Sequence, residues 1–158
     1  MKVSITLEGT NELIAAFSTV EKGLDFRTLG TWDAVATEFR KIEKEQFAGE
    51  GIGPSGKWKP LSAVYAKRKI KKYGNQPILQ ASGRLAKSLT GTTADSVLEK
   101  TAQELTIGTN VPYAGYHQRG SKARPPVDLS EQQLDRIGTV ITRKMKQLAA
   151  NARLGELR

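Results

Sequence analysis

Few side chains in this sequence could do chemistry, and the most suggestive are the single histidine, His117, and its neighbours Tyr113 and Tyr116. A neutral imidazole can serve as a base or as a metal ligand. The chain has one His and no Cys, and the acids that next follow it in sequence, Asp128 and Glu131, do not complete a ligand set. We therefore expect His117 to be a structural residue, and we predict neither a metal nor a cofactor.

Other patterns resemble catalytic motifs but lack what those motifs need. The stretch GEGIGPSGK, Gly49 to Lys57, is as rich in glycine as a phosphate loop, yet Trp58 stands where Ser or Thr is required and no apolar strand precedes it. No G-x-S-x-G nucleophile elbow occurs. A nuclease would need clustered carboxylates to hold metal ions, and the basic middle of the chain has none. We predict that the protein is not an enzyme.

The charge of the chain is concentrated in one segment. The net charge is +9, and residues 51–94 hold nine basic and no acidic groups, while the remaining residues hold 16 of each sign. Such a segment favours a polyanion or an acidic protein surface, although a solvated basic face is the commoner meaning of a charge cluster. The candidate contact residues are Lys67, Arg68, Lys69, Lys71 and Lys72.

Aromatic residues interleave with these cations, a pattern that single-strand nucleic-acid binders use. They are Trp58, Tyr65 and Tyr73. No helix-turn-helix or RNA-recognition signature accompanies them, so the pattern alone is weak support for nucleic-acid binding.

The length of 158 residues predicts a single domain over 1–158, and the absence of Cys excludes a disulfide framework. Apolar runs are far shorter than the roughly 20 residues that span a bilayer, and the first residues lack a signal-peptide core. We expect a protein made in the cytosol, with no membrane partner.

The first half of the chain is predicted to contain a strand and two helices, followed by a basic excursion. Alternating apolar residues predict a strand over Lys2–Glu8, and apolar residues at helical spacing predict helices over Leu13–Leu24 and Phe26–Phe47. Ala48–Pro77 is predicted to be a flexible basic arm that contains a short helix, Ala63–Lys72, capped by Ser62.

The second half is predicted to contain a small sheet and a final helix. Ala81–Leu89 is expected to be a short helix or turn, followed by strands over Ser88–Thr93, Ser96–Lys100 and Gln103–Gly108. Pro112 can start a helical turn, and Ser130 with Gln133 forms a capping box before a helix whose apolar face is Leu134, Ile137, Ile141, Met145 and Leu148. The fold class is α+β: a small antiparallel sheet packed by two N-terminal helices and a C-terminal helix, with a basic loop/helix excursion.

Five short blocks stand in a fixed order along this frame. They are WKPLS (58–62), ILQASGRLAKSLTG (78–91), LTIGTN (105–110), YAGYHQRG (113–120) and RPPVDLS (124–130). In this order they resemble the phage virion morphogenesis (tail completion) family, over about Thr31 to Gln147. One block departs from the family pattern, which often has an apolar pair such as Pro-Phe before the Leu-Ser. Here Val127 follows two prolines, and we expect it to be the apolar anchor.

The resemblance implies a non-enzymatic structural protein of the phage head–tail junction, located in the virion neck or tail end. It implies tail completion and head–tail joining by a ring, expected to be a hexamer, around the DNA channel. Its partners would be neighbouring connector and tail tube proteins and the passing phage DNA, bound non-specifically. The candidate lysines and arginine would face the DNA channel or a neighbouring subunit. A sequence-independent nucleic-acid-binding protein is the alternative.

The individual residues of the blocks have plainer meanings. We expect turns, caps and packing contacts, rather than direct binding, from Trp58, Gly83, Arg84, Tyr113, His117 and Gly120. In particular, Gly83 is expected to adopt a backbone angle that other residues avoid, and the tyrosines to pack on the sheet with their polar tips hydrogen-bonded.

Overall fold

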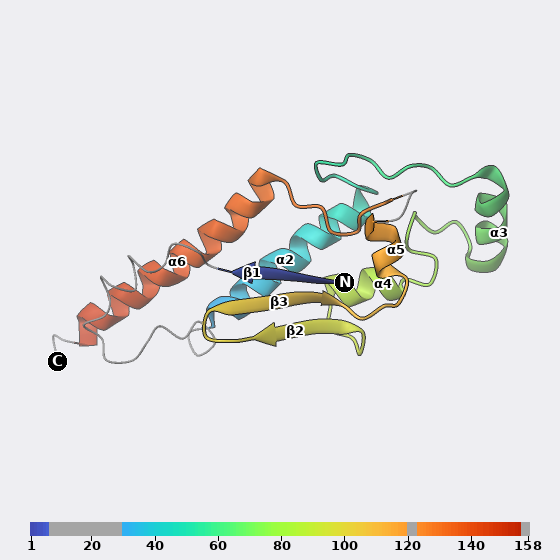
Figure 1. Ribbon diagram of the computed structural model, residues 1–158. Helices are drawn as coiled ribbons and strands as arrows, with labels where there is room; N and C mark the ends of the chain where they lie inside the picture. Colours follow the sequence, from blue (N-terminus) through green and yellow to red (C-terminus); the bar gives the residue numbers. More distant parts are fainter. Residues whose placement is uncertain (7–29, 120–122, 156–158) are drawn as a thin grey trace.

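A three-stranded antiparallel sheet lies beside one long buried helix, and a second long helix packs against that helix (Figure 1). The computed structural model describes residues 1–6, 30–119 and 123–155. Their elements are β1 (Lys2–Thr6), α2 (Thr31–Ala48), α3 (Ala63–Tyr73), α4 (Arg84–Thr90), β2 (Ser96–Lys100), β3 (Glu104–Thr109), α5 (Ala114–Arg119) and α6 (Glu131–Gly155). This arrangement confirms the α+β class. The predicted helix Leu13–Leu24 and the predicted motif residue Gly120 lie outside the described residues.

The sheet has β3 at its centre, in the order β1-β3-β2. Val3 of β1 and Leu98 of β2 both stand opposite Ile107 of β3, so apolar residues line up across the three strands. Leu105 and Ile107 are buried, as the alternating pattern predicted. The sheet thereby presents one apolar face to the rest of the molecule.

Helix α2 is the centre of the core. It begins at Thr31, later than predicted, because Gly30 stands immediately before it with a positive φ of 66° that ends any helix arriving from upstream. Its buried positions follow helical spacing and are Thr31, Trp32, Val35, Ala36, Phe39, Ile42, Glu43, Gln46 and Phe47. The aromatic and Ile stripe is therefore core and does not form a ligand site, as the sequence indicated.

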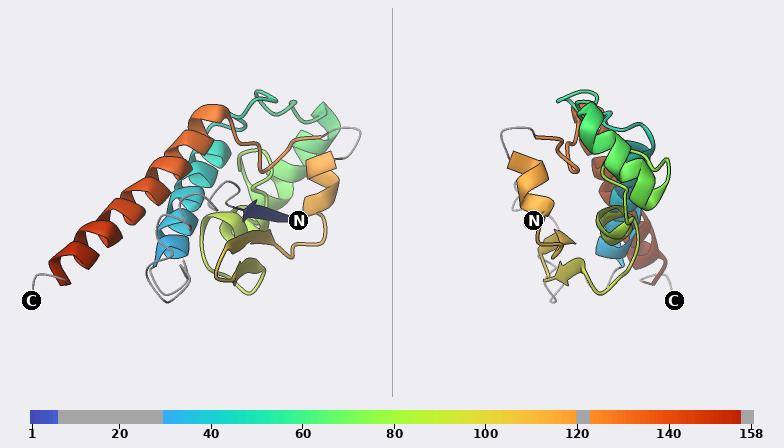
Figure 2. Two further views of the ribbon diagram at one scale, coloured as in Figure 1. Left: turned by 60° about the vertical axis from the view of Figure 1, so that its left-hand side comes forward. Right: turned by 90° about the vertical axis from the view of Figure 1, so that its right-hand side faces the viewer.

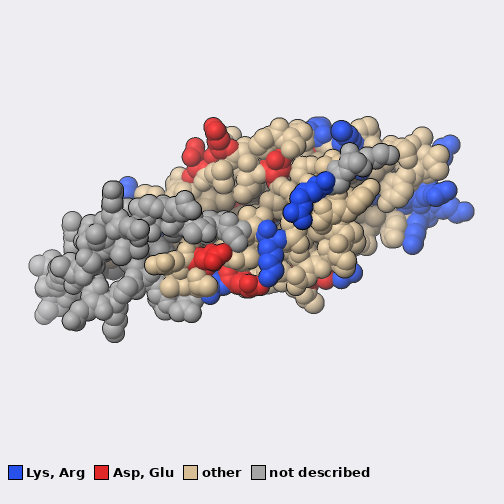
Figure 3. All heavy atoms as spheres, in the orientation of Figure 1, with Lys and Arg blue, Asp and Glu red and all other residues tan. Residues whose placement is uncertain are grey.

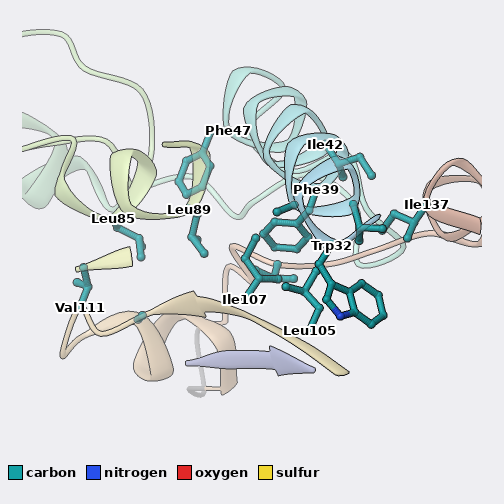
Figure 4. Close-up of a cluster of buried hydrophobic side chains, with 14 of the residues drawn as sticks. Trp32, Phe39, Ile42, Phe47, Leu85, Leu89, Leu105, Ile107, Val111 and Ile137 are labelled. Carbon is teal, nitrogen blue, oxygen red and sulfur yellow. The ribbon is translucent and has the colours of Figure 1, made fainter. Parts of the chain in front are cut away.

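The core is continuous from α6 through α2 to the sheet (Figure 4). Trp32 and Phe39 extend from α2 toward the β3 side chains of Leu105 and Ile107. Ile137 of α6 lies beside Ile42 of α2. At the far end of α2, α4 contributes Leu85 and Leu89 and contacts both α2 and the sheet. Trp32 also donates its indole N–H to the carbonyl of Thr101 at 2.9 Å, which ties α2 to the β2–β3 turn.

The predicted strand Ser88–Thr93 is wrong, because α4 runs through Thr90. Hydroxyl groups explain the difference: within the helix, Ser88 donates to the carbonyl of Leu85 and Thr90 donates to that of Ala86. With those groups satisfied internally, Leu85 and Leu89 fall on one buried face at helical spacing. The strands predicted at Ser96–Lys100 and Gln103–Gly108 are confirmed, the second shifted by one residue.

Helix α6 starts at the predicted capping box. The backbone N–H of Ser130 donates to Gln133 Oε1 at 2.8 Å, and the N–H of Gln133 donates back to Ser130 Oγ at 3.3 Å. Just before the box, Val127 is 7% exposed, which confirms it as the apolar anchor. The predicted apolar face of the helix is wrong at Leu134, which is 51% exposed, while Val140 takes a core position instead. None of the helices in the described residues is long and apolar enough to cross a membrane.

Candidate functional site

The arm predicted over 48–77 corresponds to a segment, residues 49–80, that we call the basic arm from here on and that leaves the C-terminal end of α2 and returns toward α4 (Figures 1 and 2). Helix α3 lies at its tip, at one end of the molecule. The helix begins at the predicted cap, where Ser62 Oγ accepts a hydrogen bond from the N–H of Tyr65 at 3.4 Å, and ends at Gly74. The predicted helix Ala63–Lys72 is therefore confirmed, one residue longer.

The first part of the arm, which leads from α2 to α3, is anchored to the segment that precedes α6. Gln46 Nε2 and Trp58 Nε1 both donate to the carbonyl of Pro125, at 3.2 and 3.0 Å. The Arg124 guanidinium donates to the carbonyls of Lys59 and Pro60, at 2.7 and 3.0 Å. These bonds, formed across more than sixty residues of sequence, hold the base of the arm in place.

The last part of the arm, which leads from α3 back to α4, is anchored to the end of α2. Glu50 accepts a hydrogen bond from the N–H of Ile78 at 2.6 Å, and Gln80 donates to the carbonyl of Phe47 at 2.9 Å. The arm is thus held at its base on both the outgoing and the returning side, and its tip projects from the molecule. Whether the tip moves in solution stays a prediction.

Almost all of α3 is exposed. Apart from the half-buried Ala66 and the buried Lys69, every residue from Ala63 to Tyr73 has an exposed side chain. The apolar ones among them are Val64 (63% exposed), Tyr65 (52%), Ile70 (53%) and Tyr73 (39%). An amphipathic helix whose apolar residues face water presents a surface suited to a partner.

The five candidate cations on α3 separate into two groups. Lys67, Arg68, Lys71 and Lys72 are exposed, and Figure 3 shows Lys and Arg gathered at this end of the molecule. Lys69 differs, because it is 6% exposed and its ammonium donates to the carbonyls of Gln76 and Pro77. Lys69 therefore closes the turn after α3, and the other four cations form the accessible set.

The aromatic residues of the segment also separate. Trp58 is 5% exposed and packs edge-on against Phe47, with ring centroids 5.4 Å apart, so it cannot stack on a base. Tyr65 and Tyr73 remain accessible, and the ammonium of Lys72 lies 5.1 Å from the centre of the Tyr73 ring.

A second surface cluster surrounds the histidine. The rings of Tyr113 and Tyr116 stand edge-on to His117, at 5.9 and 5.6 Å. Tyr113, just before α5, and Tyr116, within it, are 41% and 62% exposed, so the expectation that they pack on the sheet is wrong. His117 Nδ1 is buried with no hydrogen-bond partner among the described residues. Burial lowers the pKa of His117, and the nearby Arg124 guanidinium lowers it further, which favours the neutral ring.

Hydrogen bonds join the first, fourth and fifth sequence blocks to one another, and the second block to the third. Trp58 of the first block binds Pro125 of the last. Ser88 Oγ and Thr109 Oγ1 meet at 2.7 Å, which joins α4 to the end of β3. Gln118 on α5 donates to the carbonyl of Val127 at 2.7 Å and accepts from its N–H at 3.3 Å. The blocks therefore build the frame that carries the arm.

Two further motif residues act at a turn. Gly83 caps α4 with a φ of 70°, as expected for a backbone angle that side chains disfavour. Arg84 makes a two-point ion pair with Asp95, with both N–O distances at 2.7 Å. This hydrogen bonding holds the pKa of Asp95 below its usual range. Gly83 therefore has the role that the sequence predicted, whereas the ion pair of Arg84 was not predicted.

Sequence reasoning missed two features of this region. The sequence predicts no role for Arg124 beyond its place in the RPPVDLS block, and a lone arginine beside two prolines gives no signal of its carbonyl partners. The exposed start of α6 was read as core, although Leu134 stands between two acids, Glu131 and Asp135. Among the described residues, no group of three or more His, Asp or Glu side chains is arranged to hold a metal ion.

Comparison with known proteins assigns the class. The model of the phage virion morphogenesis family matches residues 9–153, nearly the whole chain, and the protein belongs to that family. It is therefore a phage protein with a structural or assembly role in the virion. No curated protein and no solved structure matches the chain at a significant level.

Proposed function

We propose that this protein is a non-enzymatic subunit of the phage head–tail junction that completes the tail and joins it to the head. In this proposal several copies, expected to be six, form a ring around the DNA channel, between the connector and the tail tube. The supporting observation is the arm: an exposed basic and apolar helix held on a fixed base by hydrogen bonds from the family's own sequence blocks.

The arm suits assembly because its base is held by hydrogen bonds and its tip is exposed. Anchored surfaces lose little conformational entropy when they bind, so they can form contacts between subunits efficiently. The four exposed cations also suit a ring near DNA, since they raise the local positive potential without reading sequence. Membership of the virion morphogenesis family supports the same role.

The test is to delete the gene from the phage and examine the particles by electron microscopy. We expect filled heads and separate tails in place of joined virions, and rescue by a plasmid copy of the wild-type gene. Cryo-electron microscopy of wild-type particles should then show the chain as a ring at the neck or tail end. Joined, infectious particles from the deletion strain would overturn the proposal.

A sequence-independent nucleic-acid-binding role is the second candidate, favoured by the exposed Tyr65 and Tyr73 among the cations of α3. A gel shift with short single-stranded and double-stranded DNA at increasing salt separates the two. A dedicated binder should retain DNA at about 150 mM salt, and the substitution of both tyrosines by Ala should weaken retention severalfold. A junction subunit needs no such retention.

A further inference from the structure

Two exposed helical faces of this chain carry the same spacing with opposite charge. On α3, Lys67 and Lys71 flank Ile70, and on α6, Glu131 and Asp135 flank Leu134 in the same i, i+3, i+4 pattern. Residues at this spacing lie on one side of a helix. The two apolar residues are almost equally exposed, Ile70 at 53% and Leu134 at 51%. We propose that α3 of one copy docks on the start of α6 of a second copy.

The acidic face stands out when the described acids are considered one by one. Most already have partners: Asp33 pairs with Lys100, Glu38 and Glu45 with Arg136, Asp95 with Arg84, and Glu99 with Lys2, while Glu50 and Asp128 accept from backbone N–H groups and Glu43 is buried. Three described acids, Glu104, Glu131 and Asp135, are not buried and have neither an ion-pair partner nor a backbone N–H donor in the described part of the chain. Only the last two are one helical turn apart, and both are exposed.

The basic face is equally unused by its own chain. The ammonium groups of Lys67 and Lys71 have no acidic partner among the described residues, and Ile70 contributes to no part of the buried core. Neighbouring Tyr73 widens the apolar area of this face, at 39% exposed. Lys69, in contrast, is held by the turn carbonyls and stabilises the helix in its exposed position.

The positions of the two faces favour a contact between copies. Helix α3 forms one end of the molecule, while acidic side chains gather over the start of α6, away from that end (Figures 1 and 3). Each copy can therefore use its α3 toward one neighbour and its α6 toward another. A contact of two different surfaces is heterologous, and it closes into a ring when the rotation allows. The inference rests on the proposed ring and specifies which surfaces build it.

Both components of the contact have a physical reason. Docking removes Ile70 and Leu134 from water, which favours association. The flanking opposite charges then pair across the seam and exclude wrong registers, because like charges brought together are strongly unfavourable. Self-association should accordingly weaken as salt rises, since these charges lie at the rim of the contact.

A charge-swap experiment tests the pairing, with self-association of the full chain followed by analytical ultracentrifugation. K67E/K71E and E131K/D135K should each weaken association by roughly tenfold or more. The combined variant, which restores opposite charge with reversed sign, should recover most of the loss. K44E/K87E, which makes the same charge change at exposed lysines elsewhere, is the matched control and should associate as wild type does.

Cysteine cross-linking tests the contact directly, because the chain contains no cysteine. An equimolar mixture of I70C and L134C chains should form a disulfide-linked dimer under mild oxidation, and each variant alone should form much less. A single chain with both substitutions should give a ladder of linked copies. L134C mixed with Y65C, an exposed residue on the side of α3 away from the Lys67–Ile70–Lys71 face, is the control and should cross-link weakly.

The outcomes separate this contact from the proposed function. Rings at the neck with no cross-link between I70C and L134C, and no effect of either charge reversal, would overturn the contact and leave the junction role standing. Loss of DNA retention in K67E/K71E with unchanged self-association would mean that α3 faces nucleic acid, and would also overturn it. A wild-type chain that stays monomeric at all concentrations, with joined virions formed in its absence, would overturn both.

Discussion

Helices α2 and α3 are both amphipathic, yet the protein uses them in opposite ways. In α2 the apolar stripe is covered on two sides, by α6 and by the sheet with α4, and Trp32, Val35 and Phe39 have no exposed surface. In α3 the apolar residues stay in water, and the one buried residue is a lysine. The same sequence pattern therefore produces core in one place and free surface in the other.

The difference comes from what surrounds each helix. Helices α4 and α6 both pack against α2. Helix α3, in contrast, is held through the ends of its arm and the turn that Lys69 closes. A helix of eleven residues is marginal in isolation, so the cap at Ser62 and the Lys69 contacts help to keep it formed. Burial in α2 stabilises the fold, and exposure in α3 leaves surface for association.

The sharpest test makes the same change, Ile to Ala, once in each helix. Ile42→Ala, at a side chain that is 1% exposed, should lower the free energy of unfolding by about 2–5 kcal/mol, because it removes buried methyl groups and leaves a cavity. Ile70→Ala, at 53% exposed, should change it by less than about 0.5 kcal/mol. Urea unfolding followed by circular dichroism, at concentrations where the chain is monomeric, measures both. Equal losses would contradict the division between core and arm.

A buried charge inside α2 gives the next largest effect. Glu43 is fully buried, its carboxyl oxygens have no hydrogen-bond partner among the described residues, and desolvation raises its pKa well above the usual 4.5. Glu43→Met should therefore stabilise the protein at pH 7 by about 1–3 kcal/mol, the cost of an unsatisfied buried polar group.

The pH dependence of this effect has a definite sign. Because the folded state holds the Glu43 proton more tightly than the unfolded state does, the contribution of Glu43 to stability is most favourable below pH 4.5 and falls as the pH rises toward the raised pKa. The gain from Glu43→Met should grow over the same range, and Glu43→Gln should remove the pH dependence with a smaller gain. Unfolding curves between pH 4.5 and 8 measure both, and a gain that does not change with pH would contradict the assignment.

The α2–α6 contact has a smaller electrostatic component, centred on Arg136. Its guanidinium donates to Glu38 at 2.9 Å and to both oxygens of Glu45 at 2.7 and 3.0 Å. Since Arg136 and Glu45 are partly exposed, Arg136→Ala should cost only about 1 kcal/mol at low salt, and less at high salt.

Here the pH dependence has the opposite sign to that of Glu43. The hydrogen bond from Arg136 lowers the pKa of Glu45 below 4.5, so the pairing contributes fully above that value and is lost as the pH falls through the lowered pKa. The difference between Arg136→Ala and wild type should shrink accordingly below pH 4.5. Arg143→Ala, at an exposed position further along α6, is the control and should leave the acid limb of the curve unchanged.

The smallest expected effect on global stability is at the base of the arm. Arg124→Ala removes the donors to the carbonyls of Lys59 and Pro60 and should cost about 1 kcal/mol or less, because the bonded groups are exposed. Its local effect should be clear: amide hydrogen exchange should accelerate severalfold in α3 while α2 stays unchanged. Exchange that rises equally in both helices would show that arm and core unfold together.

The sequence was a good guide where local chemistry decides structure. The Ser62 cap, the Ser130–Gln133 box and the positive φ of Gly83 follow from short-range rules, and all three are found. The blocks around them also identified the family. The candidate cations were located correctly on one helix, with four of five accessible.

Tertiary contacts decided the rest. The periodicity of α6 could not show that Leu134 would lie outside the area that α2 covers. Lys69 has the same sequence signal as its neighbours, and only the turn formed by Gln76 and Pro77 makes it different. Ser88 and Thr90 lie in the stretch predicted to be a strand. Their hydroxyls bond to carbonyls of the preceding helical turn, and that contact exists only once the turn has formed.

The two tryptophans of the chain are both buried, one in α2 and the other in the arm, where its base packs against the end of α2. Trp32 lies in the core with its indole bonded to Thr101, and Trp58 lies at the base of the arm with its indole bonded to Pro125. Intrinsic fluorescence therefore contains one optical reporter for each region. In Trp58→Phe the remaining emission reports the core alone, so subtracting its melting curve from that of wild type isolates the signal of the arm without any attached dye.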